Sequence, residues 1–217
     1  MSSQAIATQS RPQVSQWSVS RAKRIFDALA ASAALSIAVP GMAVIALLVK
    51  CTSRGPVLFR QPRVGQNGLP FELLKFRTMR NMPGPLVTRS GDSRVTRVGK
   101  FLRRTKMDEL PQLWNVVRGD MSLVGPRPDL PTFWPALCSC QPGIAHLRPG
   151  LTGRASLLLR DEEGLLASVP EQDLHEYYIS HLLPKKARLD LEYAEAATFL
   201  SDIHIALDTL RTLIYSY

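Results

Sequence analysis

Two carboxylates that could carry out chemistry stand side by side at Asp108 and Glu109, between a strongly basic stretch and Pro111. A carboxylate can attack phosphorus and form an acyl phosphate, and Mg²⁺ is usually held by one or two carboxylates together with substrate phosphates. Acidic residues are also common at the start of a helix, where they accept hydrogen bonds from free backbone N–H groups. The pair therefore predicts either a helix cap or a site for phosphate chemistry.

Pro111 favours a helix start here, because proline is tolerated in the first turn of a helix and breaks its interior. We expect a helix over residues 109–119, with Asp108 at or near its N-cap and Gly119 at its end. A capping Asp lies at the positive end of the helix, so this position predicts an ionised Asp108.

Positive charge is concentrated around the acidic pair. The chain carries a formal net charge of +9, and residues 50–120 hold 15 Lys or Arg against 5 Asp or Glu. Such a concentration predicts a phosphate-bearing partner, which is a nucleic acid, a nucleotide or an anionic lipid. Mg²⁺ held by one carboxylate could reduce the repulsion between the other carboxylate and a diphosphate. The cations that we place nearest the pair are Lys75, Arg77, Arg80, Arg103, Arg104, Lys106 and Arg127.

An uncharged segment of 22 residues, 28–49, is long enough to cross the hydrocarbon of a bilayer. Pro40 stands in its middle, where the proline ring removes a backbone hydrogen bond and kinks a helix. Both flanks are basic, and basic flanks stay in the cytoplasm. The segment therefore favours a re-entrant helical hairpin that enters and leaves on one face, over a single span, a buried core helix or a signal peptide.

Other patterns indicate smaller elements around the site. Apolar runs at 57–59 and 71–76 flank Asn67-Gly68, which predicts a β-hairpin. Residues 93–106 predict a basic helix that lies on an anionic surface, and residues 197–217 predict an amphipathic helix.

These elements together predict an α+β fold that is mostly helical, with interfacial amphipathic helices and a small β-hairpin around the active site. We expect three parts, which are a disordered tail (1–20), a re-entrant membrane helix (21–50) and a cytoplasmic catalytic domain (51–217).

Three motifs carry a resemblance that covers most of the chain from about Lys23 onward. They are "GPVLFRQPRVGQNG" (55–68), "KFRTM" (75–79) and "RVGKFLRRTKMDELPQLWNVVRGDMSLVGPRP" (97–128). In this order they resemble the bacterial sugar transferase family, the monotopic phosphoglycosyl transferases, in its short form. The family's re-entrant helix usually breaks at Ser-Pro, whereas this chain has Val39-Pro40, so the serine's bond to the backbone is absent.

The resemblance implies a reaction and a place for it. A sugar 1-phosphate would pass from a UDP-sugar to polyprenyl (undecaprenyl) phosphate, with release of UMP, through a covalent phosphosugar-aspartyl intermediate. This would be the first membrane step in the assembly of a surface glycan or exopolysaccharide. The enzyme would sit in the bacterial inner membrane, with its catalytic domain on the cytoplasmic face and Mg²⁺ as its cofactor.

The resemblance also implies roles for single residues. Asp108 would be the nucleophile, and Glu109 would help to hold Mg²⁺. Arg103 would lie near the polyprenyl phosphate or the phosphate network of the active site. Phosphate or nucleotide contacts would come from Lys75, Arg77 and Arg127, for which surface charge or contact with anionic lipid is the alternative.

Two other functions remain open at this point. A non-enzymatic basic scaffold on anionic lipid would not depend on Asp108. A nucleic-acid-binding module would leave the apolar segment unexplained, and no recognition motif for nucleic acid is present. The sequence leaves open the sugar, the pathway and the oligomeric state, and we expect selectivity for the sugar to depend partly on residues 157–217.

Overall fold

The computed structural model describes residues 14–80, 82, 84, 88 and 91–215. It is mostly helical, with two small two-stranded sheets, which confirms the predicted balance of helix and strand. The helices are α1 (Arg21–Thr52), α2 (Arg97–Arg104), α3 (Gln112–Arg118), α4 (Trp134–Cys140), α5 (Arg154–Leu158), α6 (Glu162–Ala167), α7 (Leu174–Tyr177), α8 (Leu183–Ala196) and α9 (Phe199–Tyr215). The strands are β1 (Leu58–Val64), β2 (Pro70–Phe76), β3 (Ser122–Val124) and β4 (Gly150–Thr152).

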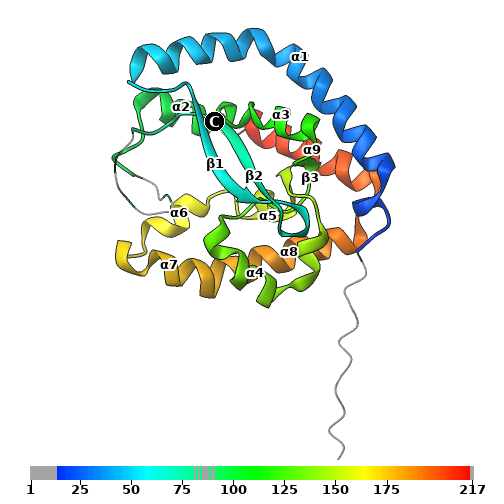
Figure 1. Cartoon of the computed structure of the whole chain (residues 1–217). Helices are drawn as coiled ribbons and strands as arrows, with labels where there is room; N and C mark the ends of the chain where they lie inside the picture. The colour runs from blue at the N-terminus through cyan, green and yellow to red at the C-terminus, as the bar shows by residue number, and fades with distance from the viewer. Residues whose placement is uncertain (1–13, 81, 83, 85–87, 89–90, 216–217) are drawn as a thin grey trace, which may run out of the picture.

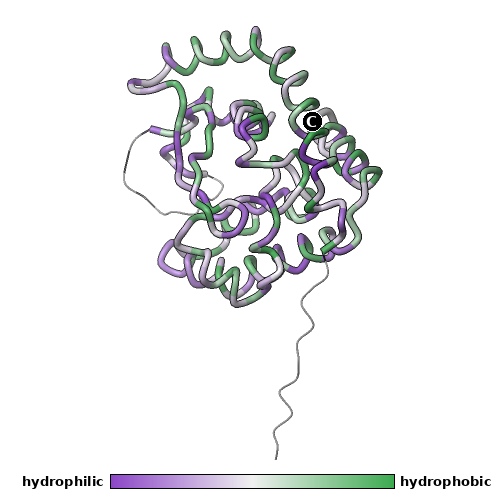
Figure 2. The backbone as a smooth tube through the Cα atoms, turned by 45° about the vertical axis from the view of Figure 1, so that its right-hand side comes forward, coloured by the Kyte–Doolittle hydropathy of each residue, from purple (hydrophilic) through white to green (hydrophobic). Residues whose placement is uncertain are grey.

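Helix α1 is one continuous helix with Pro40 inside it, and it arches over the rest of the molecule (Figure 1). The structure therefore has a single curved helix where the sequence predicted a hairpin. Among the described residues, this is the one helix that is long and apolar enough to cross a membrane. Figure 2 shows the arch as predominantly hydrophobic, and large apolar side chains along it are exposed, namely Ile25, Leu29, Ile37, Val39, Val44, Leu47 and Leu48.

Both ends of α1 pack on the same globular body. Near its N-terminal end, Ala31 is fully buried in a cluster with Leu113 and Val116 of α3. Near its C-terminal end, Val49 is buried in a second cluster with Phe76 of β2 and Leu102 of α2. The middle of the helix is thus held away from the body while its two ends are fixed to it.

The predicted β-hairpin is confirmed. Strands β1 and β2 pair antiparallel from Leu58 opposite Phe76 to Val64 opposite Pro70. The turn places Asn67 at φ 58° and Gly68 at φ 78°, which are values that Asn and Gly adopt more readily than other residues. The hairpin runs across the middle of the molecule (Figure 1), and Lys75, near the end of β2, lies 3.8 Å from Glu109. The second sheet, in which β3 pairs parallel with β4, was not predicted.

The basic helix and the C-terminal amphipathic helix are also confirmed, as α2 and α9. The predicted N-terminal tail differs in its last part. Trp17–Val19 form a 3-10 turn, and the Trp17 Nε1–H donates to Asp202 Oδ2 of α9 at 2.9 Å. Residues 1–13 of that prediction lie outside the described residues.

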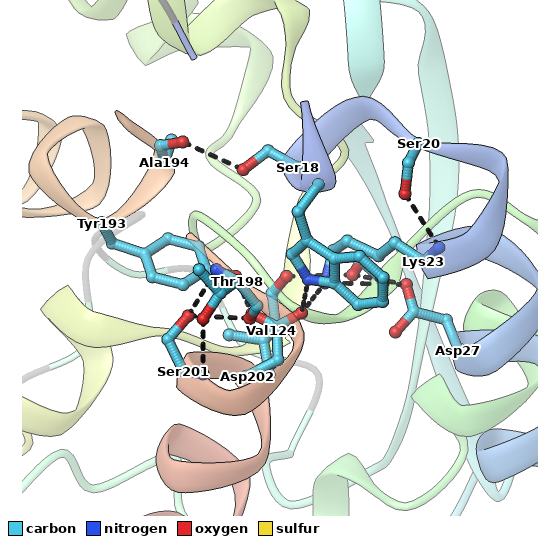
Figure 3. A network of polar contacts seen from close by, with 12 residues as sticks. Ser18, Ser20, Lys23, Asp27, Val124, Tyr193, Ala194, Thr198, Ser201 and Asp202 are labelled. Atoms are coloured by element: carbon cyan, nitrogen blue, oxygen red, sulfur yellow. Dashed lines mark hydrogen bonds and ion pairs between the residues drawn. The ribbon is translucent and has the colours of Figure 1, made fainter. Parts of the chain in front are cut away.

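A buried polar junction fixes the start of α1 to α9 (Figure 3). Besides Trp17, the carboxylate of Asp202 accepts hydrogen bonds from Lys23 of α1 and from the Tyr193 hydroxyl of α8. One helical turn after Lys23, Asp27 accepts from Ser122 Oγ of β3 at 2.7 Å. Helix α1 is therefore attached to the body through charged groups as well as through apolar packing.

Candidate active site

Asp108 and Glu109 lie in a 3-10 turn, Met107–Glu109, between α2 and α3. Lys106, at φ 55°, adopts the left-handed conformation that separates this turn from α2. The predicted N-cap position of Asp108 is wrong, because the N-cap residue of α3 is Pro111. The extra turn displaces Asp108 from the helix start. The predicted end of α3 is confirmed, since Gly119 follows it at φ 97°.

Asp108 is buried, and its Oδ1 atom has no hydrogen-bond partner among the residues that the structure describes. Burial, together with the neighbouring charge of Glu109, raises the pKa of Asp108 to about 6. The sequence predicted a carboxylate stabilised in its ionised form, and that expectation is wrong in direction. The side chain instead holds its proton more tightly than an ordinary Asp does.

Glu109 has its pKa shifted in the opposite direction, which favours the ionised form. Its Oε1 atom accepts a hydrogen bond from Arg127 Nη2 at 2.8 Å and lies 3.8 Å from Lys75 Nζ. Burial alone would raise the pKa of Glu109, but the charges of Arg127, Lys75 and Lys106 outweigh it and hold that pKa well below its usual range. Glu109 is therefore ionised throughout the neutral range, and Arg127 is its fixed partner.

Lys75 is a cation that can lose its proton at mildly alkaline pH. Burial lowers the pKa of Lys75 to about 8, although Glu109 partly offsets the effect. Two nearby guanidinium groups, those of Arg127 and Arg63, lower it further. Three cations, Lys75, Arg127 and Arg63, therefore lie near two buried carboxylates, Glu109 and Asp108. The surplus positive charge is what a phosphate group would neutralise.

The predicted site residues line one cavity of about 1340 Å³. It brings together Asp108 and Glu109 with all four predicted substrate contacts, which are Lys75, Arg77, Arg103 and Arg127. Apolar residues of the same wall come from α1 and α9 and include Ala30, Ala34 and Leu210. Segments far apart in the sequence thus enclose the acidic pair beside the apolar helix.

Arg103 and Arg77 have different partners. Arg103, on α2, pairs with Glu163 of α6 at 2.6 Å. Arg77 is buried and donates to Ser53 O at 2.7 Å and Ser53 Oγ at 2.8 Å, so it fastens the end of β2 to the end of α1. Within the described part of the chain, Arg103 Nη1 and two nitrogens of Arg77 have no hydrogen-bond partner. Both side chains therefore keep donors that a phosphate could use.

Sequence reasoning missed several polar residues of the cavity. Arg63 of β1, Asp129, Glu162, Tyr178 and Lys186 all line it. Asp129 is the one with a usable local signal, because it stands two residues after Arg127 in the same proline-rich turn. The others come from segments that meet only through the tertiary fold.

The described residues of the cavity supply only some of the ligands that a divalent cation needs. Within the described ranges, no group of three or more His, Cys, Asp or Glu side chains could hold a metal ion. Asp108 and Glu109 offer two adjacent carboxylates, and Asp108 Oδ1 has no partner among the described residues. Two carboxylates suit Mg²⁺ because that ion commonly completes its coordination with water and substrate phosphates.

A buried acidic pair among cations, in a cavity that reaches an apolar helix, defines a site suited to phosphate groups. Residues 18–216 match the bacterial sugar transferase family, and the chain belongs to this family.

The names of individual relatives specify different sugars. The chain is 39% identical over 198 residues to UDP-glucose:undecaprenyl-phosphate glucose-1-phosphate transferase of Caulobacter vibrioides, covering 88% of this chain and 69% of the relative. It is 36% identical to undecaprenyl-phosphate glucose phosphotransferase of Komagataeibacter xylinus, covering 96% and 38%. It is 35% identical to UDP-N-acetylgalactosamine-undecaprenyl-phosphate N-acetylgalactosaminephosphotransferase of Aeromonas hydrophila, covering 90% and 44%. The chain therefore spans less than half the length of the last two relatives.

Proposed function

We propose that this protein transfers a sugar 1-phosphate from a UDP-sugar to undecaprenyl phosphate and releases UMP. The reaction is the one named for its relatives, and it would begin the assembly of a surface glycan or exopolysaccharide. The observation that carries the proposal is Asp108 itself. It is a buried carboxylate with a raised pKa and an unpartnered oxygen among the described residues, in a cavity that also holds Glu109 and the cations Lys75, Lys106 and Arg103.

In the first half-reaction, an oxygen of ionised Asp108 attacks the phosphorus that bears the sugar. The new Asp108–phosphorus bond forms as the bond to the UMP oxygen breaks, so UMP leaves with that electron pair. A pKa near 6 keeps Asp108 ionised at neutral pH while making it a stronger nucleophile than an ordinary Asp. In the second half-reaction, an oxygen of undecaprenyl phosphate attacks the same phosphorus and frees Asp108.

The surrounding cations stabilise the charge that this exchange moves. Glu109 holds Arg127 and Lys75 beside the nucleophile, and these cations offset the charge on the phosphoryl oxygens. We place Mg²⁺ at the same acidic pair, where it would neutralise diphosphate charge and favour departure of UMP. Arg103 and Arg77 are the proposed outer phosphate contacts, through the donors that lack protein partners among the described residues.

The arrangement of α1 supports a re-entrant mode of membrane insertion. Its middle is apolar and exposed, while Ala31 and Val49 are both buried against the same body. A helix that crossed the bilayer completely would carry these two residues toward opposite faces. The curvature of α1, the presence of Pro40 within it and the basic flanks fit entry and exit on the cytoplasmic side, where nucleotide sugars are made.

The test is release of UMP from a UDP-sugar by detergent-solubilised protein with Mg²⁺ and undecaprenyl phosphate. Asp108→Asn keeps the size and polarity of the side chain and removes the nucleophilic charge, so we expect no release above background. Asp120→Asn changes an acid that pairs with Arg118 instead, and it serves as the matched control with activity near wild type. Activity near wild type in Asp108→Asn would refute the proposed role, since a contaminating enzyme would give that result. A non-enzymatic scaffold would release no UMP even with the wild-type chain.

A further inference from the structure

A second polar cluster lines the cavity, and the proposed phosphate chemistry does not use it. The Tyr178 hydroxyl donates to Asp129 Oδ1 at 3.0 Å and accepts from Lys186 Nζ at 2.9 Å. Lys186 Nζ also donates to Glu162 Oε2 at 3.1 Å. All four side chains belong to the wall of the cavity that contains Asp108. We call these four residues the Tyr178 cluster.

The fold places the Tyr178 cluster next to the acidic pair through one short segment. Arg127 bonds to Glu109, and Asp129, two residues later, bonds to Tyr178. The intervening carbonyl of Pro128 accepts from Arg63 Nη1 at 2.9 Å, which fixes the segment on β1. Tyr178 begins a π-helical turn, Tyr178–Leu182, between α7 and α8, and such turns are frequent at functional sites.

The charge of the cluster differs from that around Asp108. Burial and Asp129 raise the pKa of Tyr178, so the residue presents a neutral hydroxyl at neutral pH. Tyr178, Asp129 and Glu162 outweigh the effect of burial and raise the pKa of Lys186, so it presents an ammonium group. Two carboxylates then face one ammonium group, one hydroxyl and the nearby guanidinium group of Arg63. This balance gives a phosphate no net attraction, in contrast to the cations around Glu109.

The cluster still has hydrogen-bonding capacity toward the cavity. An ammonium group has three N–H donors, and the two named bonds use two of those on Lys186. A hydroxyl oxygen has two lone pairs, and Lys186 occupies one of those on Tyr178. A carboxylate accepts several bonds, and Glu162 is only partly buried. Donors and acceptors side by side match neighbouring hydroxyl groups, each of which both donates and accepts.

From these contacts we infer that the Tyr178 cluster binds the sugar of the nucleotide sugar and discriminates between sugars through their hydroxyl groups. This inference rests on the proposed function, since it assigns a sugar subsite to the same cavity. The phosphates would lie among Arg127, Lys75 and Arg103, and the sugar would extend toward Tyr178 and Lys186. Discrimination is expected because a site built to bond a hydroxyl group rejects ligands that place it elsewhere.

The experiment compares binding of UDP-sugars with binding of UMP, which has no sugar on its phosphate. Dissociation constants are measured by calorimetry for UDP-glucose, UDP-galactose, their two N-acetylamino counterparts and UMP, in the full chain carrying Asp108→Asn so that no donor is consumed. Three substitutions are introduced separately into the Asp108→Asn chain. They are Tyr178→Phe, Glu162→Gln and the control Tyr177→Phe. Tyr177 neighbours Tyr178 but stacks on His181 instead of joining the cluster.

We expect Tyr178→Phe and Glu162→Gln each to weaken binding of the preferred UDP-sugar about fivefold to tenfold, the typical effect of one or two lost hydrogen bonds. The order of preference among the four sugars should narrow or change. Binding of UMP should stay within twofold of the background in both variants, and Tyr177→Phe should change neither ligand.

Two results would overturn the inference. One is unchanged affinity and unchanged order among the sugars in both variants, and the other is a parallel loss of UDP-sugar and UMP binding, which marks a structural role. If Tyr178→Phe fails to fold, the result for Glu162→Gln alone tests the inference, because the Glu162 side chain is partly exposed. Turnover of the otherwise native chain is measured separately, so selective binding without UMP release would refute the proposed function and leave the sugar subsite standing.

Discussion

Asp108 and Glu109 are adjacent in the chain, yet their surroundings shift their pKa values in opposite directions. Asp108 lacks a partner for Oδ1 among the described residues, whereas Glu109 is enclosed by Arg127 and Lys75. Pairs of titratable groups with diverging pKa values commonly divide chemical roles between them. In the proposed mechanism, Asp108 attacks phosphorus and Glu109 positions the cations.

From these two acids and Lys75 we predict a bell-shaped pH dependence of UMP release in the donor half-reaction. The rate should rise as Asp108 ionises near pH 6 and fall as Lys75 loses its proton near pH 8. Steady-state kcat/KM for the UDP-sugar between pH 5 and pH 9 checks both limbs. Lys75→Arg keeps the charge to higher pH and should remove the alkaline limb alone. A profile that Lys75→Arg leaves unchanged would contradict the assignment.

Burial of the ionised Asp108 should also reduce the stability of the protein. Because folding raises the pKa of Asp108 from 3.8 to about 6, the native state holds its proton more tightly, and stability falls as pH rises between those values. At pH 8, Asp108→Asn should therefore gain on the order of 2 kcal/mol in the free energy of unfolding, and the gain should disappear near pH 4.

Chemical denaturation in detergent at the two pH values measures this difference. Glu109→Gln is the matched variant and should lose stability at pH 8, since Arg127 and Lys75 would be left without their carboxylate. If Asp108→Asn destabilises the protein as much as Glu109→Gln does, then Asp108 is a structural ion-pair partner and the contrast between the two acids is wrong.

At the scale of elements, the structure connects the apolar helix to the catalytic body through the junction at Asp202. Removal of this carboxylate leaves the buried Lys23 with only the more distant Asp27, 3.9 Å away, and deprives Tyr193 and Trp17 of their acceptor. Loss of one member of a buried ion pair typically costs about 3 to 5 kcal/mol. We therefore expect Asp202→Ala to lower the free energy of unfolding by roughly that amount.

Asp208→Ala is the control on the same helix, because its pair with Arg211 is exposed and such pairs contribute under about 1 kcal/mol. Urea unfolding followed by tryptophan fluorescence compares the two variants. Similar losses in both would mean that the junction in Figure 3 carries no special stability.

The proposed re-entrant insertion of α1 leads to a second prediction about the elements. Ala22 precedes the apolar arch and Cys51 follows it, and both are exposed. With Cys138 and Cys140 changed to Ser, native Cys51 and an Ala22→Cys substitution supply one label site on each flank. In intact cells, both sites should react with a membrane-permeant maleimide and neither with an impermeant one. Impermeant labelling at position 22 would mean that the helix crosses the bilayer.

Local sequence signals predicted the β-hairpin and the helices α2, α3 and α9, but not the β3–β4 sheet or the helices α4 to α8. Asn67-Gly68 and Gly119 were informative because turn and helix-end conformations depend mainly on the residues that adopt them. The state of Asp108 could not be predicted locally, because its pKa depends on burial beneath segments distant in sequence. The Tyr178 cluster joins residues 49 positions apart, Asp129 and Tyr178, so no short motif could reveal it.

For the whole molecule, one cavity has to serve a water-soluble donor and a lipid-linked acceptor. Cations from β2, α2 and the Arg127 segment enclose Asp108, and the apolar wall comes from α1 and α9. A single phosphate site of this kind can serve both substrates only in turn. In the proposed mechanism, a covalent bond to Asp108 would hold the phosphosugar while the substrates exchange.

The most direct measurement is the mass of the intact protein after incubation with UDP-sugar and Mg²⁺ alone, followed by peptide mapping. The account predicts an added sugar phosphate on the peptide that contains Asp108, released UMP in equal amount, and loss of the adduct when undecaprenyl phosphate is added. A preparation that turns over but carries no adduct on Asp108 under these conditions would contradict it.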